Sequence, residues 1–473
     1  MGLPSITGGG TCDKKINTMS ISSINPYNAE LLKKFTEDSD QKIEKALSLG
    51  ESTFRTWSAT PFSVRRELMH TCADLLEKRI EELAEIITLE MGKVIAESRA
   101  EIKKCAWVCR YYADHAEAFL QDEKLEVEEA ESYLVYDPLG IVLAIMPWNF
   151  PFWQVFRFAA PGLMAGNTGL LKHASNVPQC ALAIEDIFRA AGFPDGAFQT
   201  LLIGSGKVNR VIDDPRVKAV SLTGSDIAGR KVAERAGRNL KKLVLELGGS
   251  DPFIVLKEAD LEQAAATAVK ARMINCGQSC IAAKRFIVEE AIFDGFIEIF
   301  NATISGLKGG DPLMEENDYG PMAREDLVEE IDQQVATSVS LGAKVLIGGN
   351  RSGTASCFFS PTILTKVRPG MPAFDEELFG PVAAVISAKD ASEAVEIANA
   401  SRFGLGASLW TKDIDHARQL ARKIETGAVF VNAMVASHPH VPFGGIKDSG
   451  YGRELSHLGI REFMNTKSVW IAR

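Results

Sequence analysis

The sequence predicts an α/β protein of more than one domain, and three observations support that fold class. The chain has 473 residues, which is three domain lengths at about 150 residues each. Its composition, 46% hydrophobic and 24% charged, is that of a globular protein and excludes a disordered or fibrous chain. Short apolar runs alternate with stretches of helical periodicity, as a parallel sheet covered by helices requires.

The first half of the chain has a Rossmann-like alternation of strands and helices. Residues 40–120 repeat apolar side chains at positions i, i+3 and i+4, as in Leu68, Cys72 and Leu75, so we expect helices that cover a sheet. Short apolar or β-rich runs predict the strands, at 133–136, 141–146, 168–171, 199–202, 219–222 and 243–245.

A second α/β alternation begins after Gly248 and Gly249. It contains a predicted helix at 261–273 and predicted strands at 253–256, 285–288, 382–386 and 428–432. Half of the residues in 121–132 are Asp or Glu, which predicts a solvated connector that leads into an edge strand at 133–136. Residues 1–19 lack an apolar core and predict a flexible leader.

Charge and cysteine usage exclude several classes of partner. A net charge of −10 opposes binding to nucleic acid or to an anionic membrane surface. The most apolar stretch, 139–171, is broken by prolines, asparagines and an arginine, so it does not predict a membrane span. The 8 cysteines form no CxxC pair, which fits reduced thiols in a cytoplasmic protein. We therefore expect a small-molecule substrate.

Two residues in separate segments form a candidate catalytic pair. Cys280 lies in a small polar loop between a predicted helix and a predicted strand, and Glu246 ends an apolar strand. A cysteine by itself is more often a small buried hydrophobic residue than a nucleophile. A carboxylate at that strand end, however, needs a cleft or a partner. Together the two side chains could support covalent catalysis followed by base-assisted hydrolysis.

Two strand ends carry candidate anion-binding groups. Gly224 and Ser225 join a strand to a helix, where free N–H groups could meet a phosphate, although a glycine there also simply permits a tight turn. Lys172 ends another strand and Ser175 precedes the next helix, a pattern that fits either a ribose or phosphate site or ordinary helix capping. His438 and His440 have no third ligand in view, so no metal site is predicted.

Residues 20–473 resemble the NAD(P)-dependent aldehyde dehydrogenases. Six motifs and Lys172 occur in this chain in the same order as in that family. The segment 277–286 is most similar to bacterial succinate-semialdehyde dehydrogenases. The matching residues are Pro147-Trp148-Asn149-Phe150-Pro151, Lys172, Thr223-Gly224-Ser225, Glu246-Leu247-Gly248-Gly249, Gly277-Gln278-Ser279-Cys280, Glu377-Leu378-Phe379-Gly380-Pro381 and Pro442-Phe443-Gly444-Gly445-Ile446-Lys447.

The resemblance implies a division of the chain into three parts. Residues 20–121 and 140–247 would form a Rossmann-like cofactor-binding domain, and residues 248–450 an α/β catalytic domain. A small β bridging element, built from 122–139 and 465–473, would pair strands across a subunit boundary and give a homodimer or homotetramer.

The resemblance also implies an activity, the NAD(P)-dependent oxidation of a short aldehyde, in the first place succinic semialdehyde, through a cysteine thiohemiacetal and thioester. Cys280 would be the nucleophile, Glu246 the base and Asn149 an oxyanion donor, with no metal. The cofactor would contact Trp148, Lys172, Ser175, Gly224, Ser225, Glu377 and Phe379. Many family members carry Glu where this chain has Ser175. The loss of that carboxylate removes its repulsion of a 2′-phosphate, so NADP should be tolerated or preferred over NAD.

Recognition of a substrate carboxylate is predicted for Arg157, on the helix that follows Asn149, with Trp153 on the same helical face and Ser437 from a C-terminal loop. An alternative for Arg157 is an ion pair with a local acidic residue or a surface position. Three alternatives for the function are another small aldehyde such as lactaldehyde or glutarate semialdehyde, a CoA-acylating enzyme, and a non-catalytic structural protein. Glu246 argues against the CoA-acylating enzyme, because a base would activate water.

Overall fold

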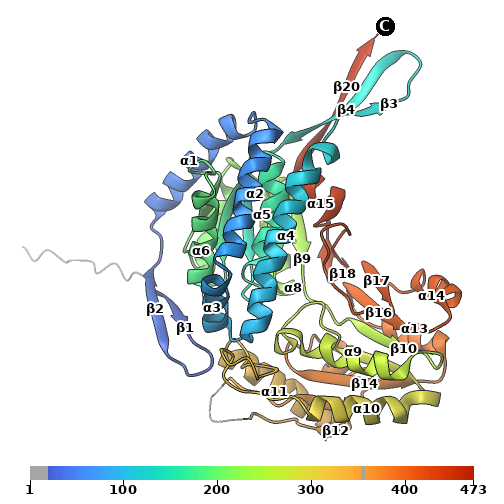
Figure 1. Cartoon of the computed structure of the whole chain (residues 1–473). Coiled ribbons are helices and arrows are strands. Elements are labelled where there is room, and N and C mark those ends of the chain that lie inside the picture. The colour runs from blue at the N-terminus through green and yellow to red at the C-terminus, as the bar shows by residue number, and fades with distance from the viewer. Residues whose placement is uncertain (1–19, 353–356, 473) are drawn as a thin grey trace, which may run out of the picture.

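A computed structural model describes residues 20–352 and 357–472, so the predicted leader at 1–19 lies outside the described residues. These residues form two α/β lobes and a β arm that projects from the first lobe (Figure 1). In this part of the chain, no helix combines the length and the apolar character needed to cross a membrane.

A six-stranded sheet forms the centre of the first lobe, in the order β19-β9-β8-β5-β6-β7. All neighbours are parallel except β19, which is antiparallel to β9. The strands are β5 (Ile141–Met146), β6 (Thr168–His173), β7 (Phe198–Thr200), β8 (Val217–Thr223), β9 (Lys242–Glu246) and β19 (Gly450–Tyr451). The predicted strands of the first half of the chain are confirmed, except that 133–136 belongs to another sheet. The short strand β19 was not predicted.

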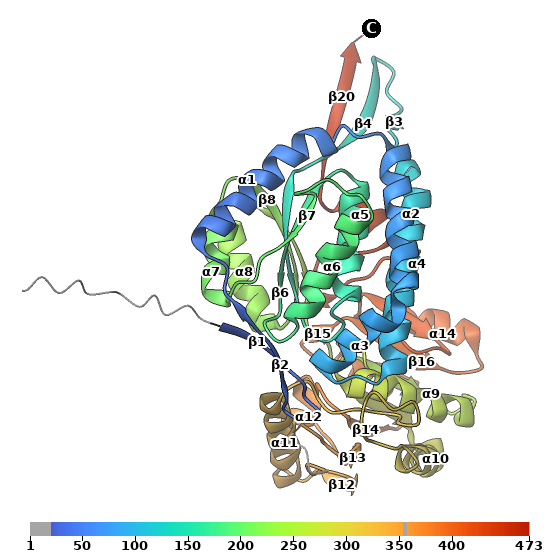
Figure 2. The ribbon, with the colours of Figure 1, turned by 60° about the vertical axis from the view of Figure 1, so that its left-hand side comes forward.

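Helices cover both faces of this sheet, as Figure 2 shows. Alternate residues of β5 explain the two layers, because Val142 packs with the helices on one face and Ile141 with those on the other. The first layer contains α2 (Phe62–Lys78), α3 (Ile80–Met91), α4 (Ile95–Phe119), α5 (Trp153–Met164) and α6 (Pro178–Ala190). The second contains α1 (Asp40–Trp57), α7 (Ser205–Asp213) and α8 (Asp226–Arg238). A hairpin of β1 (Ser20–Ile24) and β2 (Leu31–Thr36) precedes α1.

The second lobe is built on a seven-stranded sheet in the order β12-β13-β14-β11-β10-β16-β17. Its strands are β10 (Pro252–Val255), β11 (Arg285–Glu289), β12 (Lys344–Ile347), β13 (Thr362–Thr365), β14 (Val382–Ala388), β16 (Gly406–Trp410) and β17 (Ala428–Val431). Its helices are α9 (Leu261–Met273), α10 (Phe293–Ser305), α11 (Glu325–Ser340), α12 (Pro372–Asp375), α13 (Ala391–Asn399) and α14 (Ile414–Ala421). The predicted helix at 261–273 is confirmed to the residue.

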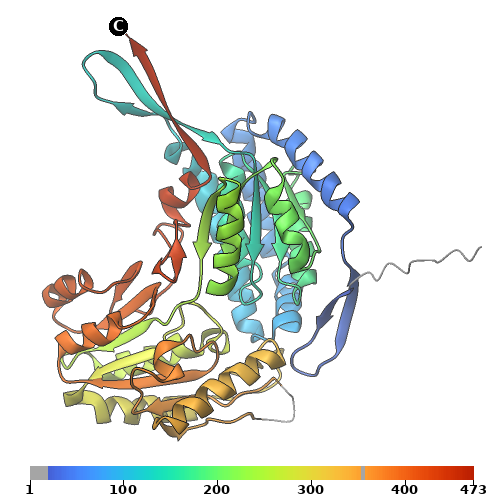
Figure 3. The ribbon, with the colours of Figure 1, turned by 180° about the vertical axis from the view of Figure 1, so that it is seen from behind.

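The arm corrects one prediction. It is an antiparallel sheet of β3 (Glu123–Leu125), β4 (Ala130–Pro138) and β20 (Met464–Ala472), in the order β20-β4-β3. The prediction of an edge strand at 133–136 is wrong, because β4 is paired on both sides and the edges are β20 and β3. Figure 3 shows the arm extending away from both lobes. The C-terminal segment therefore contributes to the first sheet through β19 and to the arm through β20.

Several short elements complete the two lobes. They are a 3-10 turn, η1 (Ile274–Gly277), the pair β15 (Phe403–Gly404) and β18 (Ile446–Lys447), and α15 (Ser456–Arg461). The turn η1 follows α9 and begins the loop that carries Cys280, while β9 ends at Glu246. The carboxyl ends of parallel strands of the first lobe therefore meet a loop of the second, as is usual for ligand sites in α/β proteins.

Candidate active site

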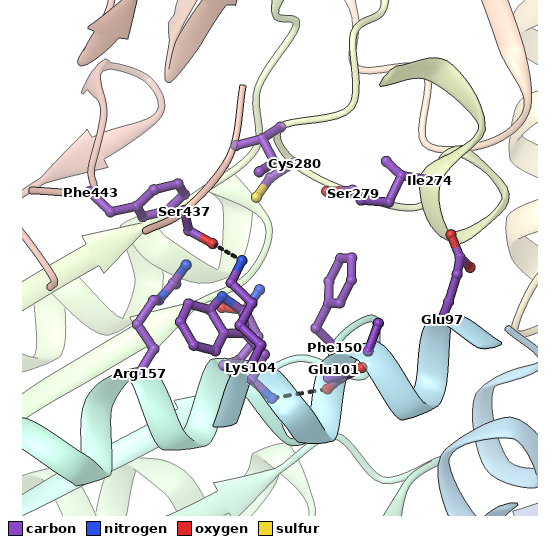
Figure 4. A pocket seen from close by; sticks show the side chains of 14 residues that line it. Glu97, Glu101, Lys104, Phe150, Arg157, Ile274, Ser279, Cys280, Ser437 and Phe443 are labelled. Atoms are coloured by element: carbon purple, nitrogen blue, oxygen red, sulfur yellow. Dashed lines mark hydrogen bonds between the residues drawn. The ribbon is translucent and has the colours of Figure 1, made fainter. Parts of the chain in front are cut away.

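A cavity of about 180 Å³ lies where the two lobes meet (Figure 4). Its lining comes from α4 and α5 of the first lobe, from the loop after α9, and from the C-terminal segment. The residues that line it are Glu97, Ala100, Glu101, Lys104, Phe150, Trp153, Gln154, Arg157, Ile274, Ser279, Cys280, Ile281, Ser437 and Phe443. The size and the largely apolar wall fit a small organic molecule.

The loop that carries Cys280 is fixed by buried polar groups. Glu97 accepts a hydrogen bond from the Asn275 N–H at 2.9 Å, and the Asn275 side chain donates to the Asn149 carbonyl at 2.7 Å. Lys284 Nζ donates to the carbonyls of Ser279 and Cys280, both at 2.7 Å. Sequence reasoning assigned no role to Glu97, Asn275 or Lys284. A buried Lys284 is exceptional for its residue type, but only the tertiary structure shows that it faces this loop.

The Cys280 side chain is half-buried and its sulfur faces the cavity in Figure 4. Burial raises the pKa of the thiol to about 12, against the opposing effect of Lys284 and Arg157. The thiol is therefore protonated at neutral pH in this state, and its use as a nucleophile requires a base.

Asn149 lies beside the same loop. Its side-chain Nδ2 donates to the Gln278 carbonyl, two residues before Cys280, at 3.1 Å. An amide nitrogen carries two hydrogens, so one N–H remains for an oxygen atom near the thiol.

Glu246 lies at the carboxyl end of β9 and is buried. Neither carboxylate oxygen has a hydrogen-bond partner among the described residues, and the side chain does not line the cavity that contains Cys280. Burial raises the pKa of Glu246 well above its usual value, while Arg157 opposes this effect. The thiol and the carboxyl group thus share Arg157 as a charged neighbour.

The residues predicted to contact the cofactor lie around the strand ends. Lys172 is half-buried at the end of β6 and forms no ion pair within the described part of the chain. Ser175, three residues later, is exposed. The Trp148 and Phe379 rings meet edge to face at 5.8 Å. Glu377 accepts from the Gly249 N–H at 3.0 Å and lies 3.3 Å from the ammonium of Lys284.

One predicted anion-binding group is not available. The Gly224 N–H donates to the Glu246 carbonyl at 3.0 Å, so the prediction of a free N–H at Gly224 is wrong. The reason is the neighbouring strand, since β8 and β9 continue their pairing beyond the predicted turn. Ser225 is the N-cap of α8 and accepts from the Ala228 N–H at 3.3 Å.

Arg157, Trp153 and Ser437 line the cavity together, as predicted, but Arg157 is already paired. Its guanidinium forms an ion pair with the buried Glu454, and its Nη2 donates to Thr223 Oγ1 at 3.3 Å. The ion pair that we considered as the alternative for Arg157 is therefore present.

Sequence reasoning missed Lys104, the second cation of the cavity. Its Nζ donates to Ser437 Oγ at 2.8 Å and lies 4.3 Å from the centre of the Trp153 ring. Nothing in the helical pattern of 95–119 marked this lysine, because its partners are 49 and 333 positions away in the sequence.

The histidine pair near the cavity has packing contacts. His438 meets the Trp107 ring at 4.6 Å and His440 meets the Tyr111 ring at 4.4 Å, which fixes the C-terminal loop against α4. Among residues 20–352 and 357–472, no group of three or more His, Cys, Asp or Glu side chains could hold a metal ion.

Comparisons with known proteins agree with this geometry. Residues 14–469 match the aldehyde dehydrogenase family. A Synechocystis protein named probable succinate-semialdehyde dehydrogenase (NADP+) is 50% identical over 454 residues, which cover 96% of this chain and 100% of that protein. Succinate-semialdehyde dehydrogenase (NADP+) 1 of Mycobacterium tuberculosis is 50% identical over 457 residues, with the same two shares.

Solved structures give the same result. The succinic semialdehyde dehydrogenase of Streptococcus pyogenes, solved in complex with NADP+, superimposes with a TM-score of 0.94 at 37% identity, and the match covers 96% of this chain and 100% of that one. The NAD-dependent aldehyde dehydrogenase of Sinorhizobium meliloti gives 0.93 at 35% identity, with 96% and 91% covered.

Proposed function

Because the chain belongs to the aldehyde dehydrogenase family, we propose that it oxidises succinic semialdehyde to succinate, with NADP+ preferred over NAD+. The relatives that are 50% identical over nearly the whole chain bear this substrate and cofactor in their names. The observation that carries the proposal is the cavity itself, which combines the Cys280 thiol with the Lys104, Arg157 and Ser437 side chains in about 180 Å³. A short aldehyde with a terminal carboxylate matches both kinds of group.

In the proposed reaction, Glu246 takes the proton of the Cys280 thiol and passes it to solvent, so that it is again a carboxylate before the later hydrolysis. The sulfur of Cys280 bonds to the aldehyde carbon and the carbonyl oxygen becomes an alkoxide. The remaining N–H of Asn149 and the backbone N–H of Cys280 stabilise this charge, and such donors are typically worth about 10²–10³ in rate. Loss of hydride from the same carbon leaves a thioester on Cys280. A water then attacks the thioester carbon, Glu246 takes the proton of that water, and the C–S bond breaks to release succinate.

The contacts of Glu246 suit this role. Because no hydrogen bond within the described residues occupies either oxygen, both oxygens are available to accept a hydrogen bond from a water. The raised pKa of Glu246 also makes the carboxylate a stronger base than an ordinary glutamate.

The residues around Lys172 fit NADP+. Bound NADP+ would supply the hydride acceptor. Lys172 is a half-buried cation without an acidic partner in the described residues, and Ser175, three residues later, has a neutral side chain. A 2′-phosphate would be attracted by the first residue and not repelled by the second. Glu377, which lies 3.3 Å from the Lys284 ammonium, and Phe379, whose ring meets that of Trp148, would contact the ribose and the nicotinamide.

We further propose a cytoplasmic homodimer or homotetramer. The catalytic thiol must stay reduced, which the cytoplasm favours. The arm exposes two strand edges, β20 and β3, that are available to a second copy of the chain.

The experiment is a panel of aldehydes with and without a terminal carboxylate, assayed with NADP+ and NAD+ by the absorbance of the reduced cofactor. We expect the highest kcat/KM for succinic semialdehyde with NADP+, and no activity for Cys280→Ala, which should still bind the cofactor. A clear preference for lactaldehyde or glutarate semialdehyde would contradict the substrate, and substantial turnover by Cys280→Ala would contradict the role of the thiol.

A further inference from the structure

Two cations line the cavity, but only one of them has an uncompensated charge. The guanidinium of Arg157 is neutralised by the buried carboxylate of Glu454. Lys104 forms no ion pair among the described residues, although it lies on the same helix as two acidic residues of the cavity. A cation in a mostly apolar cavity without an anion costs desolvation free energy, which a bound anion would offset.

The acidic residues of the cavity do not supply this anion. Glu101 pairs with Lys93 at 2.6 Å and accepts the backbone N–H groups of Phe152 and Trp153. Glu97 accepts from the Asn275 N–H and lies on the far side of the cavity from Lys104 in Figure 4. Both carboxyl groups therefore have structural partners elsewhere.

The side chain of Lys104 is positioned for a ligand. Its Nζ donates to Ser437 Oγ at 2.8 Å and lies over the Trp153 ring, so two contacts from different segments fix the ammonium. An ammonium has three hydrogens, and the bond to Ser437 leaves two for further acceptors. Figure 4 shows the ammonium and the Cys280 sulfur facing the same space.

We propose that Lys104, held by Ser437 and Trp153, is the residue that binds the terminal carboxylate of the substrate and thereby makes the enzyme selective for carboxylate-bearing aldehydes. The inference rests on the proposed function, because it assumes that such an aldehyde is the substrate. Arg157 then acts mainly as a hydrogen-bond donor at the cavity wall, since Glu454 already balances its charge. The small cavity limits the distance between the aldehyde and the carboxylate, so a short chain is selected.

The test is Lys104→Met, which keeps an unbranched side chain of similar length and removes the charge. Lys103→Met is the matched control, because Lys103 is the exposed neighbour on α4 and lies outside the cavity. For Lys104→Met we expect the KM for succinic semialdehyde to rise about ten- to a hundredfold, the range of a charged hydrogen bond. The kcat/KM for butanal should stay within about threefold of wild type. Lys103→Met should leave both aldehydes unchanged.

A second measurement does not depend on turnover. Succinate should protect Cys280 of the wild type and of Lys103→Met from alkylation by iodoacetamide, and should protect Lys104→Met far less. Lys104→Arg should restore most of the protection, because it restores the charge. The melting temperature of each variant shows whether it is folded.

The possible results separate the two proposals. A wild type that does not prefer succinic semialdehyde over butanal overturns both the proposed substrate and the role of Lys104. A wild-type preference that persists in Lys104→Met overturns only the role of Lys104 and assigns the carboxylate to Arg157. Equal losses for succinic semialdehyde and butanal in Lys104→Met show that the lysine is structural and also overturn the inference.

Discussion

Ser175 is the residue at which the choice of cofactor can be tested most directly. It is exposed and lies three residues after Lys172. A glutamate there would place a carboxylate beside the 2′-phosphate of NADP+, where the two anions repel each other in a partly desolvated site. We expect Ser175→Glu to lower kcat/KM for NADP+ far more than for NAD+, as measured by initial rates with succinic semialdehyde. Ser175→Gln, of the same size without the charge, is the control, and equal losses for both cofactors would show that residue 175 does not contact the ribose.

Lys104 gives the activity a characteristic pH dependence. Burial lowers the pKa of Lys104 to about 8, and the positive charge of the nearby Arg157 contributes a smaller part of this effect. The cation is therefore present below that pH and is lost above it. Of the other groups around it, Glu101 is paired with Lys93. Burial raises the pKa of Cys105 and lowers that of His438, so neither changes its charge between pH 7 and 9.

The quantity to measure is the ratio of kcat/KM for succinic semialdehyde to that for butanal, because the ionisation of Cys280 affects both aldehydes alike. We expect this ratio to be constant near pH 6 to 7 and to fall about tenfold by pH 9, one unit above the pKa. Lys104→Arg should keep the ratio constant to pH 9, since arginine stays protonated. A ratio that does not change with pH in the wild type would exclude Lys104 as the carboxylate ligand.

At the scale of elements, the ion pair of Arg157 and Glu454 joins α5 to the segment before α15. Both side chains are buried, and Phe443 lies 4.6 Å from the guanidinium. Removal of one partner leaves a buried charge, which typically costs about 3–5 kcal/mol. We expect Arg157→Leu to lower the free energy of unfolding in urea by about that amount. The double variant Arg157→Leu/Glu454→Leu should recover most of the loss, and fully additive losses would show that the two side chains are not coupled.

The backbone conformation of the loop that carries Cys280 depends on contacts from other elements. Asn275 and Cys276 have φ angles of 54° and 53°, in the left-handed region that side-chain-bearing residues seldom adopt. Glu97 of α4 and Lys284 hold this conformation through backbone groups on either side of it. The position of the thiol is thus determined by contacts from both lobes.

At the scale of the whole molecule, the β arm is the candidate surface for assembly. Trp470 and Ile471 of β20 are 57% and 48% exposed, on a strand whose outer edge is unpaired within the described residues. Apolar side chains on a free edge favour pairing with another chain. We expect Trp470→Lys/Ile471→Lys to reduce the mass of the assembly in light scattering. Leu240→Lys, which alters an exposed apolar residue outside the three strands of the arm, should leave the mass unchanged. An unchanged mass for the double variant would exclude the arm as the interface.

The sequence by itself determined most of the local structure and the resemblance to one family. The helix at 261–273 and most strands were predictable, because buried positions repeat with the period of a helix or fill a short strand completely. Cys280 and Asn149 were named from motifs that resemble one family, and the structure brings Asn149 beside the loop of Cys280, while their catalytic roles stay predictions.

Only the tertiary structure decided which groups meet. The central place of β4 depends on β20, more than three hundred residues later in the chain. The N–H of Gly224 is occupied by a carbonyl of the neighbouring strand, and Arg157 is balanced by Glu454. Lys104 is a typical helix residue in the sequence and becomes the uncompensated cation of the cavity only when α4 packs against the C-terminal loop. Hydrogen bonds and charge compensation depend on distance in space, and periodicity along the chain carries no information about that distance.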